Sequence, residues 1–124
     1  MGKVLVVDDE ADLRGLLADV FTDEGYEVMT ARDGVEALDV LRRECDMVVL
    51  LDLMMPRLDG RGVIHELEHD ATPHHHRVIV MSAAERLFAY STSLQSPLIC
   101  EQLAKPFELE TVIALVKKHM PGAA

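Results

Sequence analysis

Five polar side chains stand directly after short aliphatic runs in this sequence of 124 residues. They are Asp8 and Asp9 after residues 4–7, Asp52 after residues 47–51, Ser82 after residues 78–81 and Lys105 after residues 98–104. Ligands of open parallel sheets bind beyond the carboxyl ends of the strands, so these side chains are expected to converge on one rim. Carboxylates about 4 Å apart repel by about 4 kcal/mol per pair at an effective dielectric of about 20, and such a cluster needs a cation.

Oxygen ligands of this kind suit a hard divalent cation. Mg2+ typically takes one or two carboxylates, several waters and phosphate oxygens, and Asp9 and Asp52 are the preferred direct ligands. Such an ion and the Lys105 ammonium would balance the carboxylates, so that an incoming phosphoryl group meets a neutralised pocket. Asp52 is best placed to act as nucleophile and form an acyl phosphate, while Ser82 and Lys105 stabilise charge on the phosphoryl oxygens.

The segments that must position these residues alternate between buried strands and amphipathic helices. Strands are predicted over residues 4–7, 26–31, 47–51, 78–81 and, more weakly, 98–104. The first predicted helix carries Leu13, Leu16, Leu17, Val20 and Phe21 before Gly25, and the second begins at Asp33 with Glu36 three residues on. The third holds Val63, Ile64 and Leu67, and the fourth runs over residues 84–94. The fifth carries Leu109, Val112, Ile113 and Val116 before Pro121 and Gly122. Because parallel strands need helical crossovers, this alternation predicts an α/β fold with helices on both faces of a parallel sheet. Residues 1–124 are expected to form one domain.

The charge balance excludes two classes of partner. Twelve basic against 22 acidic side chains give a formal net charge of -10, which disfavours nucleic acid and anionic membranes. No apolar run approaches the roughly 20 residues of a membrane span, and no signal-peptide pattern opens the sequence, so the cytoplasm is the expected compartment.

Cys45 and Cys100 are too few and too far apart for a disulfide framework, and both are expected to be reduced, partly buried thiols.

Several histidines lie close together in the sequence. His65 and His69 are four residues apart, and three more form a run at residues 74–76. Histidines at that helical spacing can bind zinc, but no carboxylate or cysteine pattern accompanies them. The run lies between a predicted helix and a predicted strand, where polar loop residues are common, so no metal role is expected.

Four motifs occur in a fixed order along the chain. They are Val-Asp-Asp-Glu at residues 7–10, Asp-Leu-Met-Met-Pro-Arg-Leu-Asp-Gly at 52–60, Met-Ser-Ala at 81–83 and Lys-Pro-Phe at 105–107. Together they resemble the motifs of receiver domains of bacterial two-component response regulators. The resemblance covers essentially the whole chain and implies a flavodoxin-like doubly wound (βα)5 fold with strand order 2-1-3-4-5.

The same resemblance implies roles for individual residues. Asp52 would be the phosphoacceptor, Asp8 and Asp9 the acidic pair, and Lys105 the lysine typical of the family. Met54 would give its backbone carbonyl to the metal, and the bond between Lys105 and Pro106 would be cis.

Signalling partners also follow from the resemblance. A histidine kinase, a phosphotransfer protein or a small donor such as acetyl phosphate would load Asp52 with Mg2+ bound. The added charge would draw Ser82 and Lys105 inward and shift the face of the fourth helix, fifth strand and fifth helix toward a downstream protein or effector domain. A phosphorylation-dependent dimer is left open. The sequence differs from the family pattern at one position of this signalling face, because the family usually has Tyr or Phe where this sequence has Gln102.

Taken singly, these residues have plainer interpretations. Asp8 and Asp9 resemble solvated loop or capping acids, and Ser82 could cap the helix that follows it. Only their joint occurrence with Asp52 and Lys105 favours a functional site.

Three other functions compete with phosphoacceptor signalling. A degenerate receiver would only bind partners, but the intact acidic pocket argues against it. A phosphatase of the haloacid-dehalogenase type would need an aspartate and general acid at the position of Met54, so no enzyme is expected. A flavin phosphate would be repelled by the Asp-Asp-Glu run after the first strand.

Overall fold

Five parallel strands form one sheet in the computed structural model, which describes residues 2–71 and 73–122. The elements are β1 (Lys3–Val7), α1 (Ala11–Asp23), β2 (Glu27–Ala31), α2 (Gly34–Arg43), β3 (Met47–Asp52), α3 (Gly60–Glu68), β4 (Arg77–Ala83), α4 (Ala84–Ala89), β5 (Ile99–Lys105) and α5 (Leu109–His119). The strand order is β2-β1-β3-β4-β5. The predicted α/β fold and its 2-1-3-4-5 order are confirmed.

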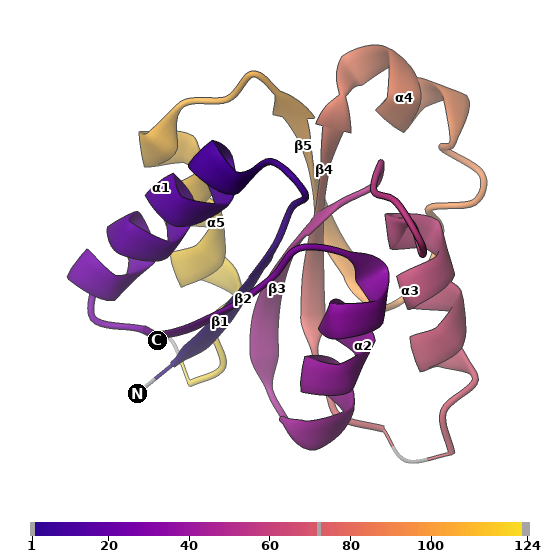
Figure 1. Ribbon diagram of the computed structural model, residues 1–124, viewed down its shortest axis with the longest axis horizontal. Coiled ribbons are helices and arrows are strands. Elements are labelled where there is room, and N and C mark those ends of the chain that lie inside the picture. The colour runs from indigo at the N-terminus through magenta and orange to yellow at the C-terminus, as the bar shows by residue number, and fades with distance from the viewer. Residues whose placement is uncertain (1, 72, 123–124) are drawn as a thin grey trace.

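The two faces of the sheet carry different helices (Figure 1). Helices α1 and α5 pack on one face, and α2, α3 and α4 pack on the other. Successive side chains of a strand point to opposite faces, so β1 sends Leu5 to the α2 side and Val6 to the α1 side. Strand β3 is buried along its whole length, as expected of a central parallel strand. Burial on both faces fixes the register, which brings the strand ends to one edge.

Local signals set the ends of α1 and α2 as predicted. Asp33 caps α2, because its Oδ1 accepts a hydrogen bond of 2.9 Å from the Glu36 amide. The Glu36 side chain in turn accepts from the Arg32 amide at 3.0 Å. Helix α1 is followed by Gly25 at φ +94°, a left-handed conformation that glycine adopts without steric cost.

Helix α4 is shorter than the sequence predicts. It spans Ala84–Ala89, whereas the prediction extended it to residue 94. The polar Ser-Thr-Ser run at residues 91–93 has low helix propensity, and the Ser93 hydroxyl donates to the Tyr90 carbonyl at 3.0 Å instead. The chain nevertheless turns back so that Leu94 is buried.

Two side chains are more exposed than the sequence predicts. Leu16 belongs to the apolar stripe of α1, yet 47% of its surface is exposed. Cys45 is exposed, whereas Cys100 is partly buried as expected. The stripe of α1 is therefore wider than the surface that the sheet covers, and Leu16 lies at its uncovered margin. None of the helices formed by the described residues has the length and apolar character needed to span a membrane.

His76 joins two elements at the edge of the sheet where β3 begins. Its ring is buried, Nε2 donates to the Leu41 carbonyl at 2.8 Å, and Nδ1 accepts from the Met47 amide at 3.2 Å. Both ring nitrogens are thus used by a neutral imidazole. Burial lowers the pKa of His76 from its ordinary value of 6.5.

Replacing His76 with phenylalanine is expected to destabilise the fold by about 2 kcal/mol, because two buried backbone groups lose their partner. Below pH 6.5 the unfolded wild type binds a proton at His76 that the folded state does not bind, so its stability should fall as the pH drops. The variant should lack this pH dependence of stability. Urea unfolding between pH 5 and 7 measures both effects, with the exposed neighbour His75→Asn as a control that should match wild type. Equal acid sensitivity of His76→Phe and wild type would contradict the assignment.

Candidate functional site

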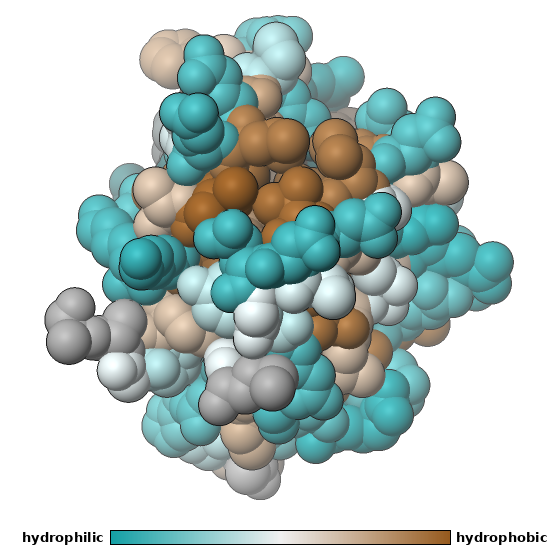
Figure 2. All heavy atoms as spheres, turned by 90° about the vertical axis from the view of Figure 1, so that its left-hand side faces the viewer, coloured by the Kyte–Doolittle hydropathy of each residue, from teal (hydrophilic) through white to brown (hydrophobic). Residues whose placement is uncertain are grey.

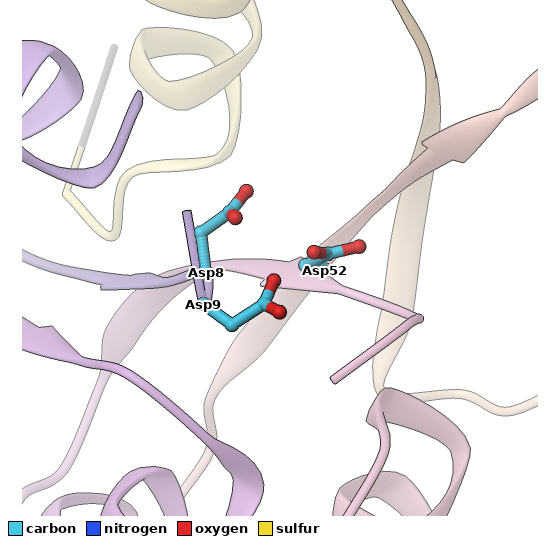
Figure 3. Close-up of side chains that lie close together, drawn as sticks. All are labelled: Asp8, Asp9 and Asp52. Atoms are coloured by element: carbon cyan, nitrogen blue, oxygen red, sulfur yellow. The ribbon is translucent and has the colours of Figure 1, made fainter. Parts of the chain in front are cut away.

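Three aspartates meet at the carboxyl ends of β1 and β3 (Figure 3). Val7 is the register partner of Leu51, so the residues that follow each of them, Asp8 and Asp52, become neighbours. Each aspartate contributes one oxygen to a group in which all oxygens lie within 4.8 Å of one another. Asp8 is 0% exposed and Asp52 is 6% exposed, whereas Asp9 is exposed. The convergence predicted for these carboxylates is confirmed by the geometry.

Lys105 reaches the same cluster from the end of β5. Its Nζ lies 2.9 Å from Asp8 Oδ2 and 3.6 Å from Asp52 Oδ2. Burial alone would lower the pKa of Lys105, but the bond to Asp8 and the charge of Asp52 outweigh it and raise that pKa above 10.5. The bond between Lys105 and Pro106 is cis, as the resemblance implied. Lys105 is therefore a fixed cation between two buried carboxylates.

The cluster keeps an excess of negative charge. Burial, with smaller contributions from the charges of Asp8 and Asp9, raises the pKa of Asp52 from 3.8 to about 6, although the Met54 amide and Lys105 act in the opposite direction. One ammonium against three carboxylates does not balance the site. Hard carboxylate oxygens in an incompletely neutralised pocket fit a small divalent cation such as Mg2+.

The loop between β3 and α3 begins inside the site. The Met54 amide donates to Asp52 Oδ1 at 3.1 Å, and the Met54 side chain is 41% exposed. At the other end of the loop, the Gly60 amide donates to the Leu53 carbonyl at 3.0 Å. A Cβ added at Gly60 would come within 2.7 Å of the Asp52 carbonyl oxygen, so this position requires glycine for close approach.

Ser82 is buried near the end of β4, one residue after Met81, which is the register partner of Asp52. The alternative role as a helix cap is not what the structure shows, since Ala83 occupies the cap position of α4 without a side-chain bond. Gln102 lies apart from these residues, exposed on β5 and paired with Val80.

An apolar groove adjoins the site. It has a volume of about 390 Å³ and is lined by Leu13, Leu16, Lys105, Pro106, Phe107 and Leu109. Figure 2 shows a hydrophobic patch on the face that carries α1 and α5. Lys105 belongs to both the groove and the aspartate cluster. The sequence does not predict this groove, because the spacing of the leucines in α1 and α5 indicates only an apolar stripe that faces the core.

The histidines form no comparable site. The rings of His65 and His69 are tilted by 43° with their centroids 4.3 Å apart, and His74 Nδ1 lies 3.8 Å from Cys45 Sγ. Among the described residues, the aspartate cluster is the one group of three or more potential metal ligands that come together.

Comparisons with known proteins converge on one family. Residues 4–117 match the model of the response regulator receiver domain. Sporulation initiation phosphotransferase F of Bacillus subtilis is 34% identical over 119 residues, which are 96% of this chain and 94% of that protein. The probable transcriptional regulator ycf27 of Porphyridium aerugineum is 38% identical over 125 residues, which are 98% of this chain but only 50% of that protein. The chain thus spans nearly all of one curated relative and half of another.

Solved structures give the same result. The receiver domain of the Francisella response regulator 1452 superposes with a TM-score of 0.84 at 30% identity, covering 97% of both chains. The response regulator protein TrrA from Thermotoga maritima, solved in complex with Mg2+ and BeF, superposes with a TM-score of 0.79 at 33% identity, covering 95% of this chain and 98% of that one.

Proposed function

The chain belongs to the response regulator receiver domain family, and on that premise we propose that Asp52 is the residue that accepts the phosphoryl group. The observation that carries the proposal is the cluster of Asp8, Asp9 and Asp52 with Lys105 between two of its carboxylates. Asp52 ends a buried central strand, is paired with Met81 of β4, and has a pKa of about 6, which leaves it mostly ionised at pH 7. An ionised carboxylate is the form that can attack phosphorus.

The transfer itself needs few groups. A carboxylate oxygen of Asp52 attacks the phosphorus of the donor, the bond from phosphorus to the donor nitrogen or oxygen breaks, and an acyl phosphate forms. The leaving group keeps the bonding pair and takes up a proton where its basicity requires one. Lys105, already 3.6 Å from Asp52, stabilises charge on the transferred oxygens, and the Ser82 hydroxyl donates a hydrogen bond to them.

Asp8, Asp9 and Asp52, with the backbone carbonyl of Met54, would hold the Mg2+ that we propose as the cofactor. When bound, the cation supplies the positive charge that the transferring phosphoryl group requires. The buried Asp8 also accepts from Lys105 and from the Glu10 amide, which keeps its carboxylate oriented. We propose a stoichiometric acceptor and not an enzyme, since Met54 stands where a recycling phosphatase would need a general acid.

The apolar groove is the surface that we propose for the protein donor, a histidine kinase or a phosphotransfer protein. A donor must bring its phosphorylated side chain to Asp52, and the groove shares Lys105 with that site. Its exposed leucines, Leu16 and Leu109, offer apolar area that a helical partner can cover. Residues 1–124 are proposed to form a single receiver domain whose output face is α4, β5 and α5, where Gln102 is exposed.

Intact-mass measurement of the purified chain with acetyl phosphate tests the acceptor function. With Mg2+ present the chain is expected to gain the mass of one phosphoryl group, because the divalent cation completes the charge balance of the pocket. Excess chelator should abolish the gain, and restored Mg2+ should return it. No gain from acetyl phosphate or any other donor, by a chain shown to be folded, would favour the degenerate binding module.

A further inference from the structure

We propose that Arg57 is a positioning residue for the phosphoryl site. Its ion pair with Asp33 holds the β3–α3 loop, residues 53–59, in the conformation on which the Mg2+ affinity of the aspartate cluster depends. The inference rests on the proposed function of that cluster, and it concerns two residues that take no part in the transfer.

The loop is tied down at both ends but makes an unusual turn in its middle. The Leu58 amide donates to the Pro56 carbonyl at 2.8 Å, which closes a three-residue turn centred on Arg57. Arg57 has φ +66°, the left-handed region that non-glycine residues rarely adopt. Three-residue turns with positive φ at the centre are rare and strained, so other contacts must hold this one.

Those contacts come from the start of α2. Arg57 Nε lies 2.8 Å and Nη2 lies 2.6 Å from Asp33 Oδ2. One position further along, the Gly34 amide donates to the Leu58 carbonyl at 3.1 Å, and a Cβ at Gly34 would clash with that carbonyl. The loop is therefore clamped to α2 at two successive residues, directly after the segment that carries Met54.

The ion pair between Arg57 and Asp33 differs from an ordinary surface ion pair, which contributes little to stability. The Arg57 side chain is 55% exposed, but its partner Asp33 is only 7% exposed. Asp33 Oδ1 is already committed to the Glu36 amide, which leaves Oδ2 for the guanidinium. These bonds, first that of the Glu36 amide and then that of Arg57, hold the pKa of Asp33 below its ordinary value. A carboxylate with both oxygens committed is a rigid anchor for the loop.

The variants Arg57→Gly and Asp33→Asn each remove the ion pair without adding backbone strain or losing the cap of α2. Glycine removes the guanidinium while relieving the positive-φ strain, and asparagine keeps the helix cap while removing the charge. Arg32→Ala is the matched control, since Arg32 is an exposed arginine at the same helix end whose partner, Glu36, is not in the loop. The readouts are the dissociation constant for Mg2+ from amide NMR titration and the Mg2+ concentration that half-saturates phosphorylation by acetyl phosphate.

Both variants are expected to weaken Mg2+ binding about tenfold, as residues that orient metal ligands typically do. Phosphorylation at saturating Mg2+ should approach the wild-type level, and the double variant should be no worse than either single one. Arg57→Lys should lie between wild type and Arg57→Gly. Wild-type Mg2+ affinity in folded Arg57→Gly, or an equal loss in Arg32→Ala, would overturn the inference. A wild type that binds Mg2+ but accepts no phosphoryl group would instead overturn the proposed function, and the NMR titration would still decide the role of Arg57.

Discussion

Asp52→Asn is expected to lose phosphoryl uptake completely. The amide has the shape of the carboxylate but lacks the ionised oxygen that attacks phosphorus. Neither Asp8 nor Asp9 is expected to replace it, since Asp8 is fully buried and bonded to Lys105, and Asp9 is an exposed residue beyond the end of β1. Intact mass after incubation with acetyl phosphate and Mg2+ should show one added phosphoryl group in the wild type and none in the variant.

Asp59→Asn is the control for this loss. Asp59 lies at the end of the same loop and caps α3 through a 2.9 Å bond from the Gly62 amide, a role that asparagine can keep. The substitution makes the same change of charge near the site and should leave uptake unchanged. Equal uptake by Asp52→Asn and wild type would show that another side chain is the acceptor.

The same variant, Asp52→Asn, is expected to be more stable than wild type when no metal is present. The folded state raises the pKa of Asp52 from 3.8 to about 6, so between these values it holds a proton that the unfolded chain has lost. The stability of the wild type should therefore fall as the pH rises through this window. Since one pKa unit corresponds to about 1.36 kcal/mol, the ionised Asp52 costs the fold about 3 kcal/mol at pH 7. Asparagine removes that cost.

Urea unfolding in the presence of chelator measures this difference. Wild type and Asp52→Asn should have similar stability near pH 4, and the variant should gain on wild type up to pH 7. Adding Mg2+ should reduce the difference, because the cation binds the folded wild type and stabilises it. A difference that does not change with pH would show that the substitution acts through packing and not through the charge of Asp52.

The general position of the site could be predicted from the sequence because it depends on a topological rule. Parallel strands end at one edge, so Asp8, Asp52 and Lys105 had to meet once their runs were recognised as strands. The contact of Arg57 with Asp33 could not be predicted, because 24 residues separate them and a flexible side chain decides the pairing. The positive φ of Arg57 likewise has no signature in a sequence without glycine at that position.

Details of exposure were predicted less well than the order of the elements. Periodicity identifies the apolar stripe of α1 but not how much of it the sheet covers, and Leu16, a member of that stripe, is 47% exposed. Helix α4 ends early because weak helix formers follow Ala89, and a tertiary contact that buries Leu94 compensates for the lost turns. Both errors concern competition between local preference and packing, which a single sequence does not resolve.

The contact between α3 and the end of α4 contains a natural fluorophore, Tyr90. The chain has no tryptophan and two tyrosines, and Tyr26 packs against Phe21 at 6.1 Å between ring centroids, on the α1 side. Tyr90 instead lies under the guanidinium of Arg61, whose carbon is 4.1 Å from the ring centroid. Arg61 directly follows Gly60, the residue that comes close to the backbone of Asp52. Movement of α4 against α3 is expected to change the distance between Arg61 and Tyr90, and with it the emission of Tyr90. In a Tyr26→Phe background, intrinsic fluorescence should therefore follow one helix of the proposed output face without any added label.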